Sequence, residues 1–409
     1  MKRVQVRLVA LCALAWVVSG EAGEWMRRIP ESVNGRKVES FWQGGSKARG
    51  ERSDVRNLVL VQHPVPGKEG KGRPLYVVLH SAGHDVLSAL ECTYTPGNHD
   101  IYRAPDDFYA LYVDCRAYSD ADWWWGADKK AGMGDTACER RVMDTVAWAL
   151  QTYGCDSNRV YLCGNSMGGS GALGLGLAHG DVFAAVKANV PAIRRADHPF
   201  KSLGLPPYAA DAAKKLPDPP VTVDYSGQDD GWSDNHERLV AGMRERKYAW
   251  MFFWGAYGHA NNNAKMAEKN DIIHAFDWLS VRLDEPYPVF TGASCDTPCP
   301  WPADRGNKGA GQINGFFRWE GAKESADGVS IALRLVAPEE LKSRFFTSPE
   351  SARVDVTLRR LRAFKVKPGD RVRWSFGDAA GEVVADADGL VTVPGLEVAR
   401  APRRLVLGR

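Results

Sequence analysis

One serine, flanked by glycines and set between two apolar runs, constrains the fold of this chain more than any other feature. Residues 159–170 read RVYLCGNSMGGS, with a Gly-x-Ser-x-Gly motif centred on Ser166. Apolar residues 160–162 precede the motif, and small and apolar residues 172–177 follow it. The pattern predicts a strand, a sharp turn at the serine and then a helix, since such a turn favours flanking residues without a Cβ. The alternative is a serine in an ordinary turn or helix N-cap.

Apolar runs and helix-like patterns alternate between residues 55 and 283. Strands are expected at 58–62, 75–79, 109–113, 184–190, 221–225 and 249–254, and helices at 136–152, 235–246 and 270–283. Strands that alternate with helices typically pair in parallel, with helices over both faces of the sheet. The expected fold class is therefore α/β, with a mostly parallel sheet covered by helices.

The pattern changes after residue 285. Prolines at five positions between 286 and 302 indicate a linker, and alternating segments follow at 313–320, 329–335, 354–361 and 372–376. Alternation with turn residues between the segments predicts a small antiparallel β-sandwich. The expected organisation is a signal peptide at 1–22, an α/β domain at 23–285 and a β-sandwich domain at 286–409.

The N-terminus has the plan of a secretory signal peptide. Three basic residues among the first seven precede the apolar run 8–18, and small residues follow it. We expect cleavage after Gly20 or Ala22 and a secreted or periplasmic protein. The apolar run is short for a membrane-spanning helix, and no later segment is long and apolar enough for one. We therefore expect no membrane association after cleavage.

Composition argues against two classes of partner. The formal net charge of +3 is small for 409 residues, and no basic stripe is interleaved with aromatic residues. Nucleic acid is therefore not an expected partner. No group of cysteines or histidines has the sequence spacing of metal ligands, so neither a metal nor a cofactor is expected.

Export changes how the cysteines are interpreted, because disulfides persist outside the cytoplasm. Seven cysteines follow the signal peptide, so at least one is expected to stay unpaired or to pair between chains. Cys163, in an expected buried strand, is the candidate for the unpaired thiol. Cys295 and Cys299 can pair locally, and a disulfide bond is expected. Cys138 and Cys155 lie near opposite ends of one expected helix, about 25 Å apart, which is too far to bond.

Two later loops supply an acid and a base. Asp229 and Asp230 lie in the loop after one expected strand, where an aspartate can accept the Nδ1–H of a histidine, and Asp230 is preferred. His259 lies in a glycine-containing loop after the last expected strand, from which it can take the proton of Ser166. A solvated turn aspartate and an exposed loop histidine are the alternatives.

Negative charge that develops on a substrate oxygen needs hydrogen-bond donors. One expected donor is the backbone N–H of Met167, directly after the serine. The second is expected from the loop LHSAGH at 79–84, through Ser81 or Ala82. A plain surface loop is the alternative.

Aromatic residues gather in one loop. Trp123, Trp124 and Trp125 are adjacent, and three neighbouring rings do not all fit one core. Exposed rings suit a sugar or an aromatic ligand, so these residues, together with Trp232 near the acid, are expected to bind substrate. A loop that packs on its own domain is an equally good alternative.

These motifs together resemble the α/β-hydrolase superfamily. GNSMGG at 164–169, LH at 79–80 and GH at 258–259 are similar to secreted esterases of the polyhydroxybutyrate-depolymerase and feruloyl-esterase type. Ser81 stands where those esterases usually have glycine. The resemblance implies ester hydrolysis through an acyl-enzyme on Ser166. It also implies that the substrate is a polysaccharide or small-molecule ester, with acetyl or feruloyl esters of polysaccharides as the expected class.

Two other functions fit parts of the pattern. A secreted serine peptidase of the prolyl-oligopeptidase type shares the same constellation, but no convincing acidic motif for binding peptide N-termini is present. A non-catalytic glycan-binding protein is the other alternative, and the intact set Ser166, Asp230 and His259 argues against it. For the C-terminal sandwich, packing or spacing is expected over glycan binding.

Overall fold

The computed structural model describes most of the chain after residue 28. The described residues are 16–17, 29–97, 99–116, 122–124, 126–127, 137–193, 199–200, 203, 217–259, 276–301, 309–341, 343 and 345–409. Of the expected signal peptide, only β1 (Trp16–Val17) is described. Within the described part, no helix is both long enough and apolar enough to cross a membrane.

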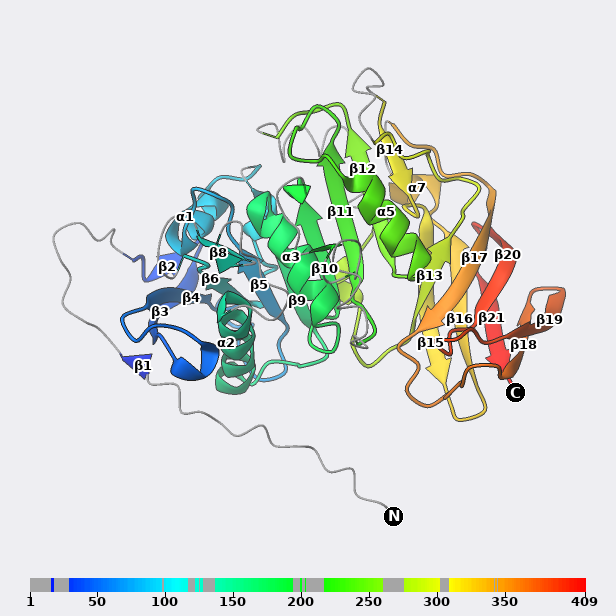
Figure 1. Ribbon diagram of the computed structural model, residues 1–409, viewed down its shortest axis with the longest axis horizontal. Helices are drawn as coiled ribbons and strands as arrows, with labels where there is room; N and C mark the ends of the chain where they lie inside the picture. Colours follow the sequence, from blue (N-terminus) through cyan, green and yellow to red (C-terminus); the bar gives the residue numbers. More distant parts are fainter. Residues whose placement is uncertain are drawn as a thin grey trace, which may run out of the picture.

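One long sheet runs through the first part of the chain, and its middle is parallel (Figure 1). Its strands are β1, β2 (Ser32–Val33), β3 (Arg36–Gly44), β4 (Arg56–Gln62), β5 (Leu75–Leu79), β6 (Tyr109–Val113), β9 (Val160–Asn165), β10 (Ala185–Asn189), β11 (Val221–Gly227), β12 (Trp250–Gly255) and β14 (Gly311–Ile313). The order is β1-β3-β4-β6-β5-β9-β10-β11-β12-β14, with β2 paired to β3. The pairs from β6 to β12 are parallel. The expected mostly parallel sheet is confirmed.

Both faces of the parallel strands are covered, which explains why most residues of these strands are apolar. Among the described residues, the helices of the first part are α1 (Val86–Glu91), α2 (Ala137–Tyr153), α3 (Met167–Ala178) and α5 (His236–Glu245), with 3-10 turns η1 (Lys47–Arg49), η2 (Cys92–Tyr94), η3 (Asp100–Tyr102) and η7 (Trp278–Ser280); the short α7 (Pro338–Leu341) belongs to the C-terminal part. Leu75, Val77 and Leu79 of β5 pack with α2 and α3. Tyr76 and Val78 pack with α1 on the opposite face, as the alternation of side chains along a strand requires.

The helix expected at 270–283 is not found as such. Residues 270–275 lie outside the described residues, and the rest of that range contains only the 3-10 turn η7. The helices expected at 136–152 and 235–246 correspond to α2 and α5.

The C-terminal part consists of two antiparallel sheets. One contains β13 (Tyr287–Thr291), β17 (Ser351–Arg359) and β20 (Thr392–Ala399). The other contains β15 (Phe317–Glu324), β16 (Gly328–Leu335), β21 (Arg403–Gly408), β18 (Arg371–Phe376) and β19 (Ala379–Val384). Val356 of β17 and Leu333 of β16 lie in one buried cluster, so the two sheets share a core. A further short hairpin, β7 (Asp122–Trp123) and β8 (Gly126–Ala127), belongs to the first part of the chain.

The proline-rich segment after residue 285 is not a simple linker. Its first residues form β13, which pairs with β17. The chain then returns to the long sheet, where β14 pairs antiparallel with β12 (Figure 1). Proline is compatible with β13 because this strand lies at the edge of its sheet, where one side needs no N–H donor.

No disulfide links the seven described cysteines, so the expected disulfide bond is not formed. Cys295 packs against the buried cluster that includes the C-terminal sheets. Cys299 packs against a different cluster, which contains residues of α5 and β12. Cys163 lies buried in β9, as expected, and its thiol donates to the Ile101 backbone oxygen at 3.2 Å.

Candidate active site

Ser166 stands between β9 and α3 in an unusual backbone conformation. Its φ is 57° and its ψ is −117°, values that a residue with a side chain rarely adopts. A Cβ on Gly164 would lie 2.1 Å from the Gly168 oxygen, and one on Gly168 would lie 2.1 Å from the Leu79 oxygen. The glycines therefore make the turn possible. The Ser166 N–H donates to the Asn189 oxygen at 2.8 Å, which fixes the turn to β10.

The structure brings Ser166, Asp230 and His259 together at the carboxyl ends of β9, β11 and β12. The Ser166 Oγ lies 2.7 Å from His259 Nε2, and His259 Nδ1 lies 2.6 Å from Asp230 Oδ2. The Asp230 side chain is fully buried, whereas Asp229, the other candidate acid, is exposed. Because Nδ1 faces a carboxylate, it carries the proton, and the lone pair of Nε2 faces the serine hydroxyl.

Buried hydrogen bonds hold the loop that carries Asp230 between β11 and α5. The Ser233 Oγ lies 2.9 Å from the Gly227 oxygen and 2.6 Å from the Asp230 oxygen. His236 Nδ1 lies 2.5 Å from the Ser233 oxygen, and the His236 ring stacks on Phe252 at 5.2 Å. The loop is thus tied through the start of α5 to β12, and the position of Asp230 follows from these contacts.

The loop after β5 lies against the serine turn from the other side. Ser81 is buried, and its hydroxyl donates to the Asn165 backbone oxygen at 2.9 Å. Ala82, the next residue, is exposed. The N–H of Met167 is the first of α3, and the first N–H groups of a helix have no acceptor within it. The expected oxyanion donors Met167, Ser81 and Ala82 thus lie on segments that touch the turn, and their role stays a prediction.

Two observations decide the fold. Ser166 occupies a sharp turn from a buried parallel strand into a helix. Asp230 and His259 then follow Ser166 in chain order, on the loops after β11 and β12, and His259 contacts both Asp230 and the serine. A serine, an acid and a histidine in this order on strand-end loops are typical of one fold. The chain has the α/β-hydrolase fold.

The solved structures that resemble this chain share little sequence with it. No family model and no curated protein matches the chain. Among solved structures, fluorophosphonate-binding serine hydrolase F of Staphylococcus aureus is 14% identical, with a TM-score of 0.41 over 55% of this chain and 92% of its own. A ferulic acid esterase is 18% identical, with a TM-score of 0.40 over 55% and 91%. Acetyl xylan esterase from Aspergillus awamori is 13% identical, with a TM-score of 0.35 over 50% and 89%.

The tryptophans expected to bind substrate occupy different places in the structure. Trp124 is fully buried, and its Nε1 donates to a backbone oxygen of the loop after β5 at 3.0 Å. The expectation of an exposed ring is therefore wrong for Trp124. Trp123 is half-buried, and Trp125 lies outside the described residues. Trp232 is half-buried beside the site, with its ring 6.3 Å from the His259 ring.

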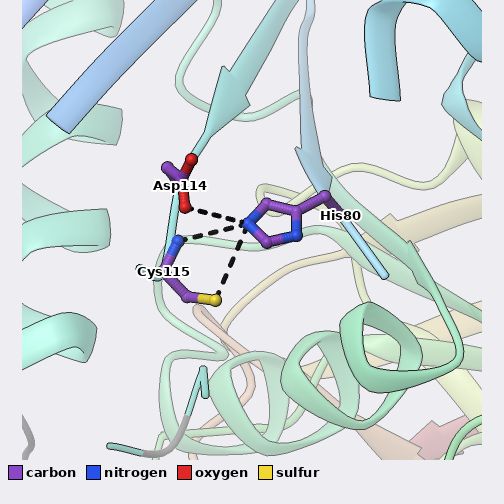
Figure 2. A group of neighbouring side chains, drawn as sticks. All are labelled: His80, Asp114 and Cys115. Atoms are coloured by element: carbon purple, nitrogen blue, oxygen red, sulfur yellow. Dashed lines mark hydrogen bonds and ion pairs between the residues drawn. The ribbon is translucent and has the colours of Figure 1, made fainter. Parts of the chain in front are cut away.

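Among the described residues, one group offers three metal-ligating atoms within 4.8 Å of one another: His80, Asp114 and Cys115 (Figure 2). Two guanidinium groups lie beside it. Arg116 Nε is 3.4 Å from Asp114 Oδ1, and Arg141 donates to the Cys115 backbone oxygen at 3.2 Å. Burial raises the pKa of the Cys115 thiol well above its usual value, so the thiol keeps its proton. The surroundings favour a hydrogen bond between His80 and Asp114 over a bound cation.

The pairing of His80 with Asp114 is the feature of this site that sequence reasoning missed. His80 directly follows β5, and Asp114 directly follows β6. These strands are parallel neighbours, with Leu79 opposite Val113. Residues that follow adjacent parallel strands meet at one edge of a sheet, so the order of the strands would have been enough to predict the contact.

Proposed function

We propose that this α/β-hydrolase is a secreted serine esterase that cleaves carboxylic esters, with acetyl or feruloyl esters of polysaccharides as the substrate class. One observation carries the proposal. A hydrogen-bonded line runs from the buried carboxylate of Asp230 through His259 to the hydroxyl of Ser166. Ser166 is 9% exposed and the His259 side chain 30% exposed, so the open end of this line is accessible to a substrate. The proposal that the protein is exported depends on the signal-peptide pattern of the N-terminal sequence.

The geometry suits acyl transfer in two halves. The Ser166 oxygen bonds to the ester carbonyl carbon while its proton passes to His259 Nε2, and Asp230 stabilises the imidazolium that forms. The imidazolium then gives this proton to the leaving alcohol as the ester C–O bond breaks, leaving an acyl-enzyme. A water molecule, deprotonated by His259, attacks the acyl carbon. The acid leaves, and the proton returns to Ser166.

The negative oxygen formed in each half needs stabilisation. The N–H of Met167 begins α3, where the helix dipole also favours negative charge. A second N–H from the Ser81–Ala82 segment completes the proposed oxyanion hole. One such donor is typically worth about 3 kcal/mol in the transition state.

Trp232 supports a ring-containing substrate. It is half-buried, and its indole lies 6.3 Å from the imidazole of His259. A flat ring at the mouth of a site can stack on a sugar or on the aromatic ring of a feruloyl group. We therefore expect feruloyl esters to bind more tightly than acetyl esters to the wild type, and Trp232→Ala to reduce this preference.

The decisive experiment compares Ser166→Ala with the wild type on a panel of acetyl, feruloyl and nitrophenyl esters, with peptide substrates alongside. We expect loss of ester hydrolysis by at least about 10³-fold, since removal of the nucleophile leaves only residual catalysis. The two neighbouring aspartates provide a matched control. Asp230→Ala should lose most activity, whereas Asp229→Ala should retain it. Full ester hydrolysis by Ser166→Ala would refute the mechanism, and cleavage of peptides alone would replace the esterase assignment with a peptidase.

A further inference from the structure

The His80 ring is clamped between two acceptors. Its Nε2 lies 3.1 Å from Asp114 Oδ1, and its Nδ1 lies 2.9 Å from the Ser81 backbone oxygen (Figure 2 shows the Asp114 side). A carboxylate and a carbonyl can only accept, so each nitrogen that faces one donates a proton. The Cys115 N–H is farther from Nε2, at 3.4 Å, so the carboxylate decides which atom carries the proton. The ring is 1% exposed, and it packs against Trp124 at 4.9 Å.

The clamp fixes the orientation of one peptide plane. The Ser81 oxygen accepts from His80 Nδ1 and also from the His84 N–H at 3.1 Å. In a trans peptide the carbonyl and the following N–H point in opposite directions. The Ala82 N–H is therefore turned away from the His80 ring.

The same loop is anchored to the serine turn. The Ser81 hydroxyl donates to the Asn165 oxygen at 2.9 Å and also meets the Tyr102 hydroxyl at 2.7 Å. A Cβ on Gly168, in the first turn of α3, would lie 2.7 Å from the His80 oxygen. The position of this loop, and its distance from the serine turn, are thus set by the backbone contact at Gly168 and by the Ser81 hydroxyl. The tilt of the Ser81–Ala82 peptide is set by the imidazole.

We propose that the His80–Asp114 pair aligns the Ser81–Ala82 peptide so that the Ala82 N–H serves as the second oxyanion donor. His80 is on this view a positioning residue, and Asp114 holds its ring. The proposal rests on the proposed esterase function. A donor that is already oriented needs no reorganisation as charge develops, and this accounts for most of its catalytic value.

Two replacements of the same histidine separate the two ring contacts. In His80→Asn the side-chain amide can reach the Ser81 oxygen as Nδ1 does, but it cannot reach Asp114. In His80→Gln the longer amide can reach Asp114 as Nε2 does, and the donor to Ser81 is lost. We expect His80→Gln to lower kcat by about 10- to 100-fold with KM unchanged within twofold. His80→Asn keeps the donor to Ser81 and loses only the contact with Asp114, so it should lower kcat less than His80→Gln does.

A trifluoromethyl ketone ester analogue supplies a second readout. The Ser166 oxygen adds to its carbonyl carbon, the proton passes to His259, and the carbonyl oxygen becomes an oxyanion. His80→Gln should weaken inhibition by the same factor as it lowers kcat. His179→Asn is the control, since its shorter amide loses a similar histidine–carboxylate contact, 2.7 Å from Nε2 to Glu139, at the other end of α3 from Ser166. It should leave kcat unchanged.

The outcomes distinguish the two proposals. A wild type that neither hydrolyses an ester nor binds the ketone covalently overturns both. An active wild type with unchanged kcat in His80→Gln overturns only the role of His80. Equal losses in His80→Gln and His80→Asn, matched by equal losses of thermal stability, would show a merely structural histidine and would also overturn it.

Discussion

Asp114 is held as a carboxylate by its neighbours. Burial raises its pKa, but hydrogen bonds and charge from His80 and Arg116 outweigh burial and lower the pKa from 3.8 to about 2. The unfolded chain lacks these partners, so it takes up the proton at a higher pH than the folded protein does. The folded state is therefore stabilised by this group above about pH 4, and the stabilisation is lost as the pH falls toward about 2.

Asp114→Asn removes this stabilisation. At pH 7 we expect the free energy of unfolding to fall by about 2 kcal/mol, because one pKa unit corresponds to about 1.4 kcal/mol. The difference from the wild type should shrink between pH 4 and pH 2. Urea unfolding at several pH values measures it, with Asp107→Asn as a half-exposed control. A difference that stays constant from pH 7 to pH 2 would contradict the contacts assigned to the Asp114 carboxylate.

The role of a single residue can be predicted from sequence where backbone geometry permits only certain residue types around it. The glycines around Ser166 are required by the turn, so the motif identified the serine. The burial of Trp124 could not be anticipated, because its environment is created by a distant glycine. A Cβ on Gly171 would lie 2.6 Å from the Trp124 ring, so the space for the indole is set by helix α3.

At the level of elements, the loop from β11 to α5 orients the proposed acid. The Ser233 hydroxyl contacts the backbone oxygens of Gly227 and Asp230, and no part of Ser233 is exposed. Without that hydroxyl, the loop would keep its length and lose the donor that closes it. Loss of the Ser233 hydroxyl should therefore lower both the stability of the fold and the rate of catalysis.

Ser233→Ala is expected to lower the free energy of unfolding by about 1 to 2 kcal/mol, the usual range for a buried hydrogen bond. It should also lower kcat several-fold with KM unchanged, because Asp230 then orients His259 less well. Urea unfolding and steady-state kinetics measure the two effects. Ser280→Ala removes an exposed hydroxyl that makes a similar bond to the Asp277 oxygen, and it should alter neither. Normal kinetics in Ser233→Ala would show that Asp230 needs no such support.

Elements with clear apolar periodicity were predictable, and elements that bury polar groups were not. Strands β5 and β6 coincide with the expected ranges because covered faces demand apolar residues. Strand β3 was missed because it carries Arg36 and Gln43 inward. The Arg36 guanidinium donates to three backbone oxygens, at 2.6 to 2.9 Å, so its burial is satisfied by partners that the sequence does not reveal.

Across the whole molecule, the C-terminal sheets and the α/β part are joined by buried contacts. Arg359, at the end of β17, donates to two backbone oxygens after α5 at 2.7 Å each. Arg360 donates to two backbone oxygens before β10 at 3.1 Å each. The Tyr287 hydroxyl donates to the Pro219 oxygen. Packing, one of the two roles expected for this part from the sequence, is therefore present, and these contacts leave the two parts dependent on each other.

A chain that ends at Glu285 should consequently fail to fold. It lacks β14, the Arg359–Arg360 contacts and the apolar residues that complete the core shared with β12. We expect insoluble protein, or soluble protein with no cooperative thermal transition. Solubility and circular dichroism on heating measure this, with the full chain beside it. A shortened protein that unfolds cooperatively near the wild-type temperature would show that the α/β part is independent.

The return of the chain to β12 has a consequence for biosynthesis. Strand β14 closes an edge that would otherwise present unpaired backbone groups to other molecules. It is made after β13, whose partner β17 is made later still. During synthesis the edge of β12 therefore stays unpaired until residue 313 has been made. Pairing of β14 with β12 during folding must therefore compete with pairing of this edge to other chains.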